Sequence, residues 1–198
     1  APELKVIARA GVGVGNIDVE YATERGILVI NTPGKNTNSA AELTMGLLLS
    51  AFRKIVPAHQ SMQSLNWDRH RFNGGELMNK CLGIIGLGNV GHRVARYAKA
   101  FDMKVQAFDP YLADEVFERH GVQKVDWITL LNTSDVITFH VPLNDETRGM
   151  ISEMEIERMK PGVILLNTAR GGVINETSLL NALHSGHVAA AGIDTWEV

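Results

Sequence analysis

The chain has 198 residues, of which 45% are hydrophobic and 21% are charged, and its formal net charge is −3. A chain of this size can bury the core of one globular domain, with room for a piece of another. The acidic balance, without a block of like charges, argues against nucleic acid or a membrane surface as a partner, since both favour a basic face. The apolar runs are too short to span a membrane and no leader pattern opens the chain, so we expect a cytoplasmic protein.

Residues 1–34 predict a strand, a glycine-rich loop, a helix and a second strand, in that order. The first strand covers residues 4–8, and Asp18 can cap the helix that follows the loop. The second strand, 27–30, runs into the turn Asn31-Thr32-Pro33-Gly34. Two strands and one helix are too few to bury a core, so we interpret this segment as part of a larger unit.

From residue 39 onward, helices and strands alternate, which is typical of a parallel α/β sheet. We expect a long amphipathic helix over 39–53 and assign no firm element to 54–80. The strands are predicted at 82–86, 103–108, 135–139, 162–167 and 188–193, with a further short one at 122–124. The helices between them are predicted at 89–101, 113–119, 126–132, 152–159 and 176–185.

A Gly-x-Gly-x-x-Gly motif at Gly86, Gly88 and Gly91 joins the apolar strand 82–86 to the helix that follows it. The first glycine permits a tight turn, the second lets the backbone approach a pyrophosphate, and the third lets the helix pack against the strand. The start of a helix also favours negative charge. The motif in this context predicts a dinucleotide site.

Asp109 ends the next strand, 18 residues after Gly91. This is close to the spacing of the acid that binds the adenosine ribose in such folds. A carboxylate there accepts hydrogen bonds from the ribose hydroxyls and repels a 2′-phosphate, so we predict NAD rather than NADP as the cofactor. The alternative is that Asp109 only begins a turn before Pro110.

Other strands also end in residues suited to a nucleotide cleft, because the carboxyl ends of parallel strands meet at one edge. These residues are His140, Val141 and Pro142, then Thr168, Ala169 and Arg170, and finally Asp194. Arg170 is the candidate catalytic residue, because its guanidinium can hold a substrate carboxylate with two parallel hydrogen bonds. The alternative for Arg170 is a surface ion pair with Glu176.

Five ordered motifs resemble those of the D-isomer-specific 2-hydroxyacid dehydrogenases. They are Ala8–Asp18, Gly26–Pro33, Ala40–Thr44, Gly83–Gly91 and Asn167–Val173. The resemblance implies an α/β fold with a Rossmann-type doubly wound parallel sheet over 35–198, which binds NAD. It also implies that residues 1–34 are a fragment of a second, flavodoxin-like substrate domain.

The resemblance implies roles for further residues. Asn89 and Val90 lie at the pyrophosphate, Val141 near the adenosine, and Asp194 at the carboxamide. On the substrate side it implies contacts from Arg9, Val12 and Gly13. One departure is that Asn89 stands where many relatives carry an arginine, which removes a cation near the phosphates.

The resemblance further implies the oxidation of D-3-phosphoglycerate to 3-phosphohydroxypyruvate, the first step of serine biosynthesis. The family's catalytic glutamate and histidine have no counterpart here, since Glu197 lies off the expected position. We therefore expect a truncated piece that does not turn over. The alternatives are another hydroxyacid such as glycerate, hydroxypyruvate or D-lactate, a non-catalytic NAD-binding module, and a methyltransferase that uses a similar loop.

The remaining expectations concern assembly, metals and the single thiol. Relatives dimerise through the cofactor domain, which makes residues 39–53 and Trp67 the candidates for a homodimer interface; the alternative is that they pack in the chain's own core. No histidine pair has metal-ligand spacing, so we predict no metal. Cys81 begins an apolar run, which favours a buried core thiol over a nucleophile.

Overall fold

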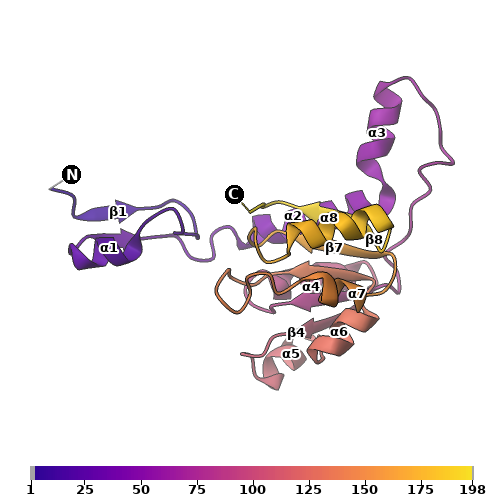
Figure 1. The fold of residues 1–198 in the computed structure, drawn as a ribbon. Coiled ribbons are helices and arrows are strands. Elements are labelled where there is room, and N and C mark those ends of the chain that lie inside the picture. The colour runs from indigo at the N-terminus through magenta and orange to yellow at the C-terminus, as the bar shows by residue number, and fades with distance from the viewer. Residues whose placement is uncertain (1–2, 198) are drawn as a thin grey trace. The chain divides into compact units, whose positions relative to one another are not determined.

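The computed structural model describes residues 3–197, and the chain divides into two compact units, Ala1–Ala40 and Ala41–Val198. The smaller unit contains β1 (Val6–Ala8), α1 (Val19–Glu24) and β2 (Leu28–Ile30), and its two strands pair in parallel (Figure 1). Asp18 caps α1 by accepting a hydrogen bond from the Tyr21 amide at 2.9 Å. The predicted strand, helix and strand are therefore confirmed.

The larger unit contains a six-stranded parallel sheet in the order β5-β4-β3-β6-β7-β8. The strands are β3 (Cys81–Ile85), β4 (Lys104–Phe108), β5 (Gln123–Lys124), β6 (Val136–Phe139), β7 (Val163–Asn167) and β8 (Val188–Ile193). Numbered from β3, this is the 3-2-1-4-5-6 order of dinucleotide-binding folds. The prediction of a doubly wound parallel sheet is confirmed, and so is the short additional strand.

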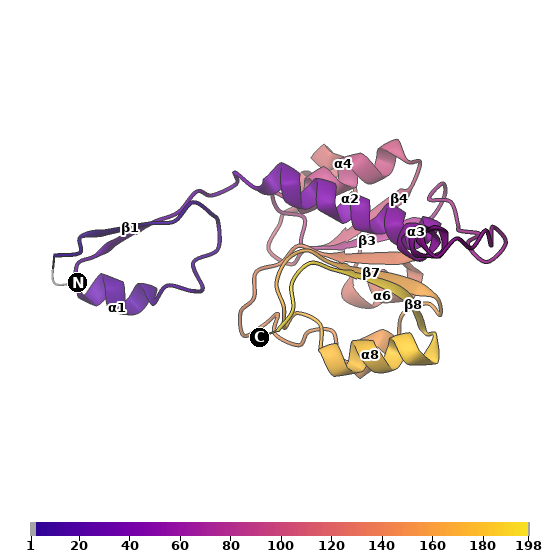
Figure 2. The same cartoon turned by 90° about the horizontal axis from the view of Figure 1, so that it is seen from above.

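Helices cover both faces of this sheet, as Figure 2 shows. One face carries α2 (Thr37–Arg53), α4 (Gly91–Ala100) and α5 (Asp114–His120). The other carries α6 (Trp127–Thr133), α7 (Glu153–Glu157) and α8 (Glu176–Ser185). Because successive residues of a strand point to opposite faces, Ile84 packs in the first core and Ile85 in the second.

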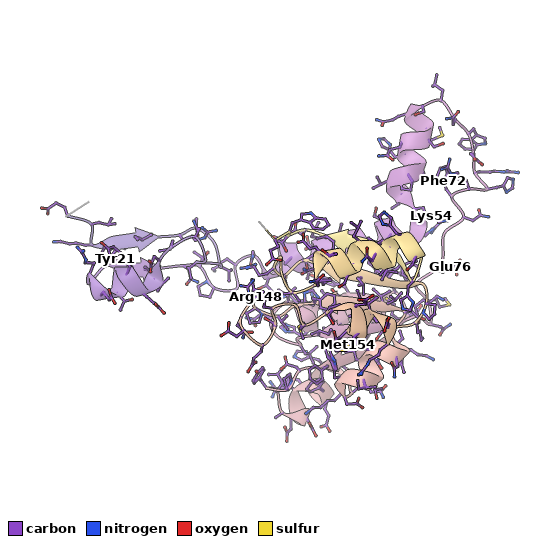
Figure 3. The ribbon with its side chains drawn as sticks, viewed as in Figure 1. Tyr21, Lys54, Phe72, Glu76, Arg148 and Met154 are labelled. Atoms are coloured by element: carbon purple, nitrogen blue, oxygen red, sulfur yellow. The ribbon has the colours of Figure 1, made fainter. Side chains whose placement is uncertain are left out.

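The segment without a predicted element contains a helix, α3 (Ile55–Gln63). Its first turn follows Lys54, which adopts a left-handed φ of 52° and breaks the path of α2 (Figure 3). None of the α3 residues is buried, and Figure 1 shows the helix standing away from the sheet. The helix is about as amphipathic as α2 and α8, so hydrophobic periodicity could have revealed it even though its apolar side chains face no core.

Candidate functional site

The predicted cofactor residues of the larger unit lie at one edge of the sheet, beyond the carboxyl ends of the strands. This follows from the topology, because the paired neighbours β3, β4, β6, β7 and β8 all run parallel. The residues that follow these strands form two groups. One group surrounds a cavity beside the glycine-rich turn, and the other forms the loop after β7.

The three glycines of the turn have different steric surroundings. Gly86 has a φ of +90°, and a Cβ there would lie 2.7 Å from the His140 carbonyl oxygen. A Cβ on Gly91 would lie 2.1 Å from the Gly86 carbonyl oxygen, whereas one on Gly88 meets nothing within 4 Å. At the start of α4, Val90 makes no side-chain cap hydrogen bond. Open space beside an uncapped helix start fits the diphosphate of a dinucleotide.

Asp109 is held between the glycine-rich turn and its own following loop. Its Oδ2 accepts a hydrogen bond from the Leu87 amide at 3.0 Å, and its Oδ1 accepts one from the Tyr111 amide at 3.1 Å. Asp109 also lines a cavity of about 350 Å³ together with Gly86 and Gly88. The carboxylate thus lines the cavity. It also stabilises the turn at Pro110, so the two interpretations of Asp109 are compatible.

His140, Val141 and Pro142 line the same cavity. Their contact with the adenosine of a cofactor stays a prediction. Burial lowers the pKa of His140 to about 3, so its ring stays neutral near pH 7. A ring nitrogen of His140 lies 3.0 Å from the Thr138 hydroxyl. A mainly apolar cavity with a neutral histidine and a carboxylate suits a nucleoside.

Sequence reasoning missed four polar residues of the cavity: Tyr111, Asn144, Glu146 and Thr147. The loop that carries three of them is fixed by Asn144, whose Oδ1 accepts hydrogen bonds from the amides of Glu146 at 3.1 Å and Thr147 at 3.0 Å. The Thr147 hydroxyl also donates to the Pro142 carbonyl at 2.6 Å. An Asn-x-x-Thr pattern after a strand end was the available signal, since asparagine side chains bond the backbone two or three residues onward.

The loop after β7 is organised by Asn167, which is only 2% exposed. Its Nδ2 donates to the Arg170 carbonyl at 2.8 Å, and its Oδ1 accepts from the Ala169 amide at 3.0 Å. The Thr168 hydroxyl lies 2.8 Å from that of Thr44 on α2. The Asp194 amide donates to the Asn167 carbonyl at 2.9 Å, which joins the end of β8 to this loop.

Arg170 is exposed, and its guanidinium donates to the neighbouring Ala169 carbonyl at 2.6 Å. The alternative partner, Glu176, instead accepts a hydrogen bond from the Glu197 amide at 2.5 Å. Glu197 itself pairs with Arg148 at 3.3 Å; Arg148 is labelled in Figure 3. Within residues 3–197, therefore, no ion pair joins Arg170 to Glu176.

The predicted substrate residues Arg9, Val12 and Gly13 lie in the smaller unit. A guanidinium nitrogen of Arg9 donates to the Asn16 side chain, and Asn31 Nδ2 donates to the Val12 carbonyl at 2.8 Å. These contacts fix the loop between β1 and α1. Their contact with a substrate stays a prediction.

Other features bear on the remaining expectations. In the described part of the chain, no helix has both the length and the apolar character that a membrane span requires. The same residues contain no group of three or more His, Cys, Asp or Glu side chains placed to hold a metal.

Cys81 is half-buried rather than buried, because it begins the strand instead of lying inside it. Burial still raises the pKa of its thiol, which disfavours the nucleophilic thiolate.

Comparison with known proteins gives consistent results. Residues 45–198 match the model of the D-isomer specific 2-hydroxyacid dehydrogenase, NAD binding domain. The chain is 51% identical to a D-3-phosphoglycerate dehydrogenase of Archaeoglobus fulgidus, over all of this chain and 37% of that protein. It is 48% identical to a hydroxypyruvate reductase of Thermotoga maritima, over 98% of this chain and 63% of that protein.

The structural comparison agrees. The structure of a D-lactate dehydrogenase from Aquifex aeolicus, complexed with NAD and lactic acid, matches with a TM-score of 0.88 at 36% identity, over 99% of this chain and 59% of that one. The chain thus spans between about a third and two thirds of the length of these relatives. Taken with the glycine-rich turn and Asp109, these matches place the chain in the D-isomer specific 2-hydroxyacid dehydrogenase family, with residues 45–198 as its NAD-binding domain.

Proposed function

We propose that the protein containing this chain oxidises a D-2-hydroxyacid with NAD, and that its substrate is D-3-phosphoglycerate, the first step of serine biosynthesis. The observation that carries the proposal is the cavity in which Asp109 faces the glycine-rich turn. The similarity to D-3-phosphoglycerate dehydrogenases supports the choice of substrate.

The residues present fit NAD in two places. Asp109 would accept hydrogen bonds from the adenosine ribose, and Gly88 leaves room for the diphosphate beside Asn89 and Val90 at the start of α4. At the other end of the site, Thr168 and Asp194 would border the nicotinamide. Bound NAD supplies the hydride acceptor for the carbon that bears the hydroxyl.

Arg170 would bind the substrate carboxylate. Its side chain is exposed at the edge of the sheet, and Asn167 holds its backbone in place through the Arg170 carbonyl. A guanidinium presents two parallel donors to a carboxylate and so orients the neighbouring carbon for hydride transfer. Lysine cannot reproduce this pairing, because its ammonium is a point charge.

The residues 1–34 would supply the substrate side of the same reaction as part of a second domain. Arg9, with its loop fixed through Asn16 and Asn31, is the cation of this segment that we assign to the substrate. The backbone at Val12 and Gly13 would border the same ligand.

The test is a steady-state assay of the protein that contains this chain, with NAD and a panel of D-3-phosphoglycerate, D-glycerate and D-lactate. We expect the highest kcat/KM with D-3-phosphoglycerate. Arg170→Lys should lower kcat/KM by about ten- to a hundredfold, which corresponds to the loss of one charge-assisted hydrogen bond. NAD binding without oxidation of any of the three acids would overturn the enzymatic proposal.

We also propose that the protein forms a homodimer through α3 and the residues that follow it up to Trp67. We call residues 55–67 the arm. The apolar side chains of this arm are exposed: Ile55 51%, Val56 55%, Met62 50%, Leu65 94% and Trp67 77%. The arm borders a mainly apolar hollow of about 800 Å³ with β8 and α8. Apolar surface of this kind is typical of protein interfaces. By contrast, α2 buries Ala41, Met45 and Leu48 in the chain's own core.

Light scattering after size exclusion tests the dimer. We expect Trp67→Asp to shift the molar mass toward the monomer. Met154→Asp is the matched control, because Met154 is also exposed, at 63%, but lies on α7 away from the arm (Figure 3). A wild-type chain that stays monomeric at every concentration contradicts the proposal.

A further inference from the structure

The cavity that contains Asp109, where we propose that the adenosine binds, has an interaction at its mouth that the proposed function does not use. The Tyr111 hydroxyl, in the loop after β4, donates a hydrogen bond to the Glu146 carboxylate, in the loop after β6. Both residues line the cavity that contains Asp109. The contact joins two loops that are separated by 35 positions in the sequence.

Each partner is attached to the cavity wall by its backbone. The Tyr111 amide donates to Asp109 Oδ1 at 3.1 Å. The backbone of the tyrosine is therefore held by the carboxylate that we assign to the ribose. The Glu146 amide donates to the Asn144 side chain at 3.1 Å, within the turn that Thr147 anchors. The side chains are exposed, but the backbone segments that carry them are held by hydrogen bonds.

This arrangement places a second negative charge near Asp109. The hydrogen bond to the Glu146 carboxylate is the leading cause that raises the pKa of the Tyr111 phenol. The charges of Glu146 and Asp109 raise this pKa further. The hydroxyl therefore remains a donor near pH 7 and keeps the Glu146 carboxylate at the mouth of the cavity. No lysine or arginine is among the described residues that line this cavity, so no lining side chain neutralises the charges of the two carboxylates.

We propose that Glu146, held at the cavity mouth by the Tyr111 hydroxyl, is a specificity-determining residue that excludes dinucleotides with a phosphate on the adenosine ribose. The inference rests on the proposed NAD binding and extends it, because it assigns the discrimination to two carboxylates rather than to Asp109 alone. A 2′-phosphate carries nearly two negative charges, and its repulsion by Glu146 weakens with distance and salt. NAD has no charge at that position.

Calorimetric titration of the 198-residue chain with NAD and NADP tests the inference. Glu146→Gln should raise the affinity for NADP about fivefold at low ionic strength, as expected for one carboxylate a few ångströms from the phosphate. The affinity for NAD should change less than twofold. Asp145→Asn is the matched control: it removes the same charge from the neighbouring exposed residue, which does not line the cavity, and should leave both affinities unchanged.

Tyr111→Phe separates the role of the hydroxyl from that of the carboxylate. It should raise the affinity for NADP by less than Glu146→Gln does, because the carboxylate is still present but no longer held. In the double variant, the second change should add nothing to Glu146→Gln, since Tyr111 acts through Glu146.

The outcomes distinguish this inference from the proposed function. A wild-type chain that binds NAD, with the same NADP-to-NAD affinity ratio in Glu146→Gln as in Asp145→Asn, overturns the role of Glu146 and leaves NAD binding intact. A wild-type chain that binds neither dinucleotide overturns both. Equal effects of Tyr111→Phe alone and in the presence of Glu146→Gln would show that the tyrosine does not act through the carboxylate.

Discussion

The Asp109 carboxylate accepts a hydrogen bond from the Leu87 amide at 3.0 Å, inside the glycine-rich turn. The residue that we assign to the ribose therefore also holds the turn that we assign to the diphosphate. Two parts of the dinucleotide would be positioned by one side chain, which couples their binding energies. This relationship leads to the first prediction.

Asp109→Asn should weaken NAD binding by about ten- to a hundredfold, since it removes a charged acceptor from both the ribose and the turn. Titration calorimetry measures the effect. The control is Asp114→Asn, which removes an exposed carboxylate that pairs with Lys124 on the surface. Equal affinities in the two variants would contradict the assignment of Asp109.

The second prediction uses the different surroundings of Gly88 and Gly91. Gly88→Ala should leave the free energy of unfolding nearly unchanged, because its Cβ meets nothing within 4 Å. It should nevertheless abolish measurable NAD binding, because the methyl group takes the space beside the helix start. Gly91→Ala should lower stability by about 1–3 kcal/mol, since its Cβ would overlap the Gly86 carbonyl and push α4 from β3. Urea unfolding combined with NAD titration checks both; similar stabilities for the two variants would refute the steric argument.

Asn167 is predicted to position the Arg170 loop. Asn167→Ala removes a buried amide with two backbone partners and should cost about 1–3 kcal/mol of stability. The Ala169 amide, which donates to Asn167 Oδ1, should lose protection from hydrogen exchange. A matched control is Asn181→Ala, at an exposed position on α8. Unchanged Ala169 protection in Asn167→Ala would rule out this positioning role.

His140 makes stability depend on pH. Its pKa is about 3 in the folded chain and near 6.5 in the unfolded chain, so the unfolded chain binds more protons between these values. The contribution of His140 is therefore fully present above pH 6.5 and declines as the pH falls toward 3, by at most about 1.4 kcal/mol per pH unit.

His140→Gln should reduce the loss of stability between pH 7 and pH 5, whereas His59→Gln, at an exposed position, should not. Urea unfolding followed by tryptophan fluorescence reports on the larger unit, because Trp67, Trp127 and Trp196 all lie in it. Parallel pH profiles for wild type and His140→Gln would show that His140 does not titrate as described.

The sequence predicted most elements because local patterns specify them. The apolar strand before Gly86 and the helix after Gly91 follow from residues adjacent in the chain, and so does the capping of α1 by Asp18. The helix α3 was missed although it is about as amphipathic as α2 and α8, because none of its residues is buried and it lies in an otherwise polar stretch. The left-handed Lys54 that begins it is invisible in the pattern.

The sequence by itself determined the parallel α/β class, because helical and extended patterns alternate along the chain. It also determined the glycine-rich turn and the position of Asp109, because these depend on spacing within one short segment. Only the tertiary structure decided which distant residues share the cavity. Tyr111 and Glu146 meet there because β4 and β6 lie on either side of β3, so the loops that follow them end at the same edge of the sheet. That adjacency is created by the order of strands in the sheet, and the order of residues in the chain does not contain it.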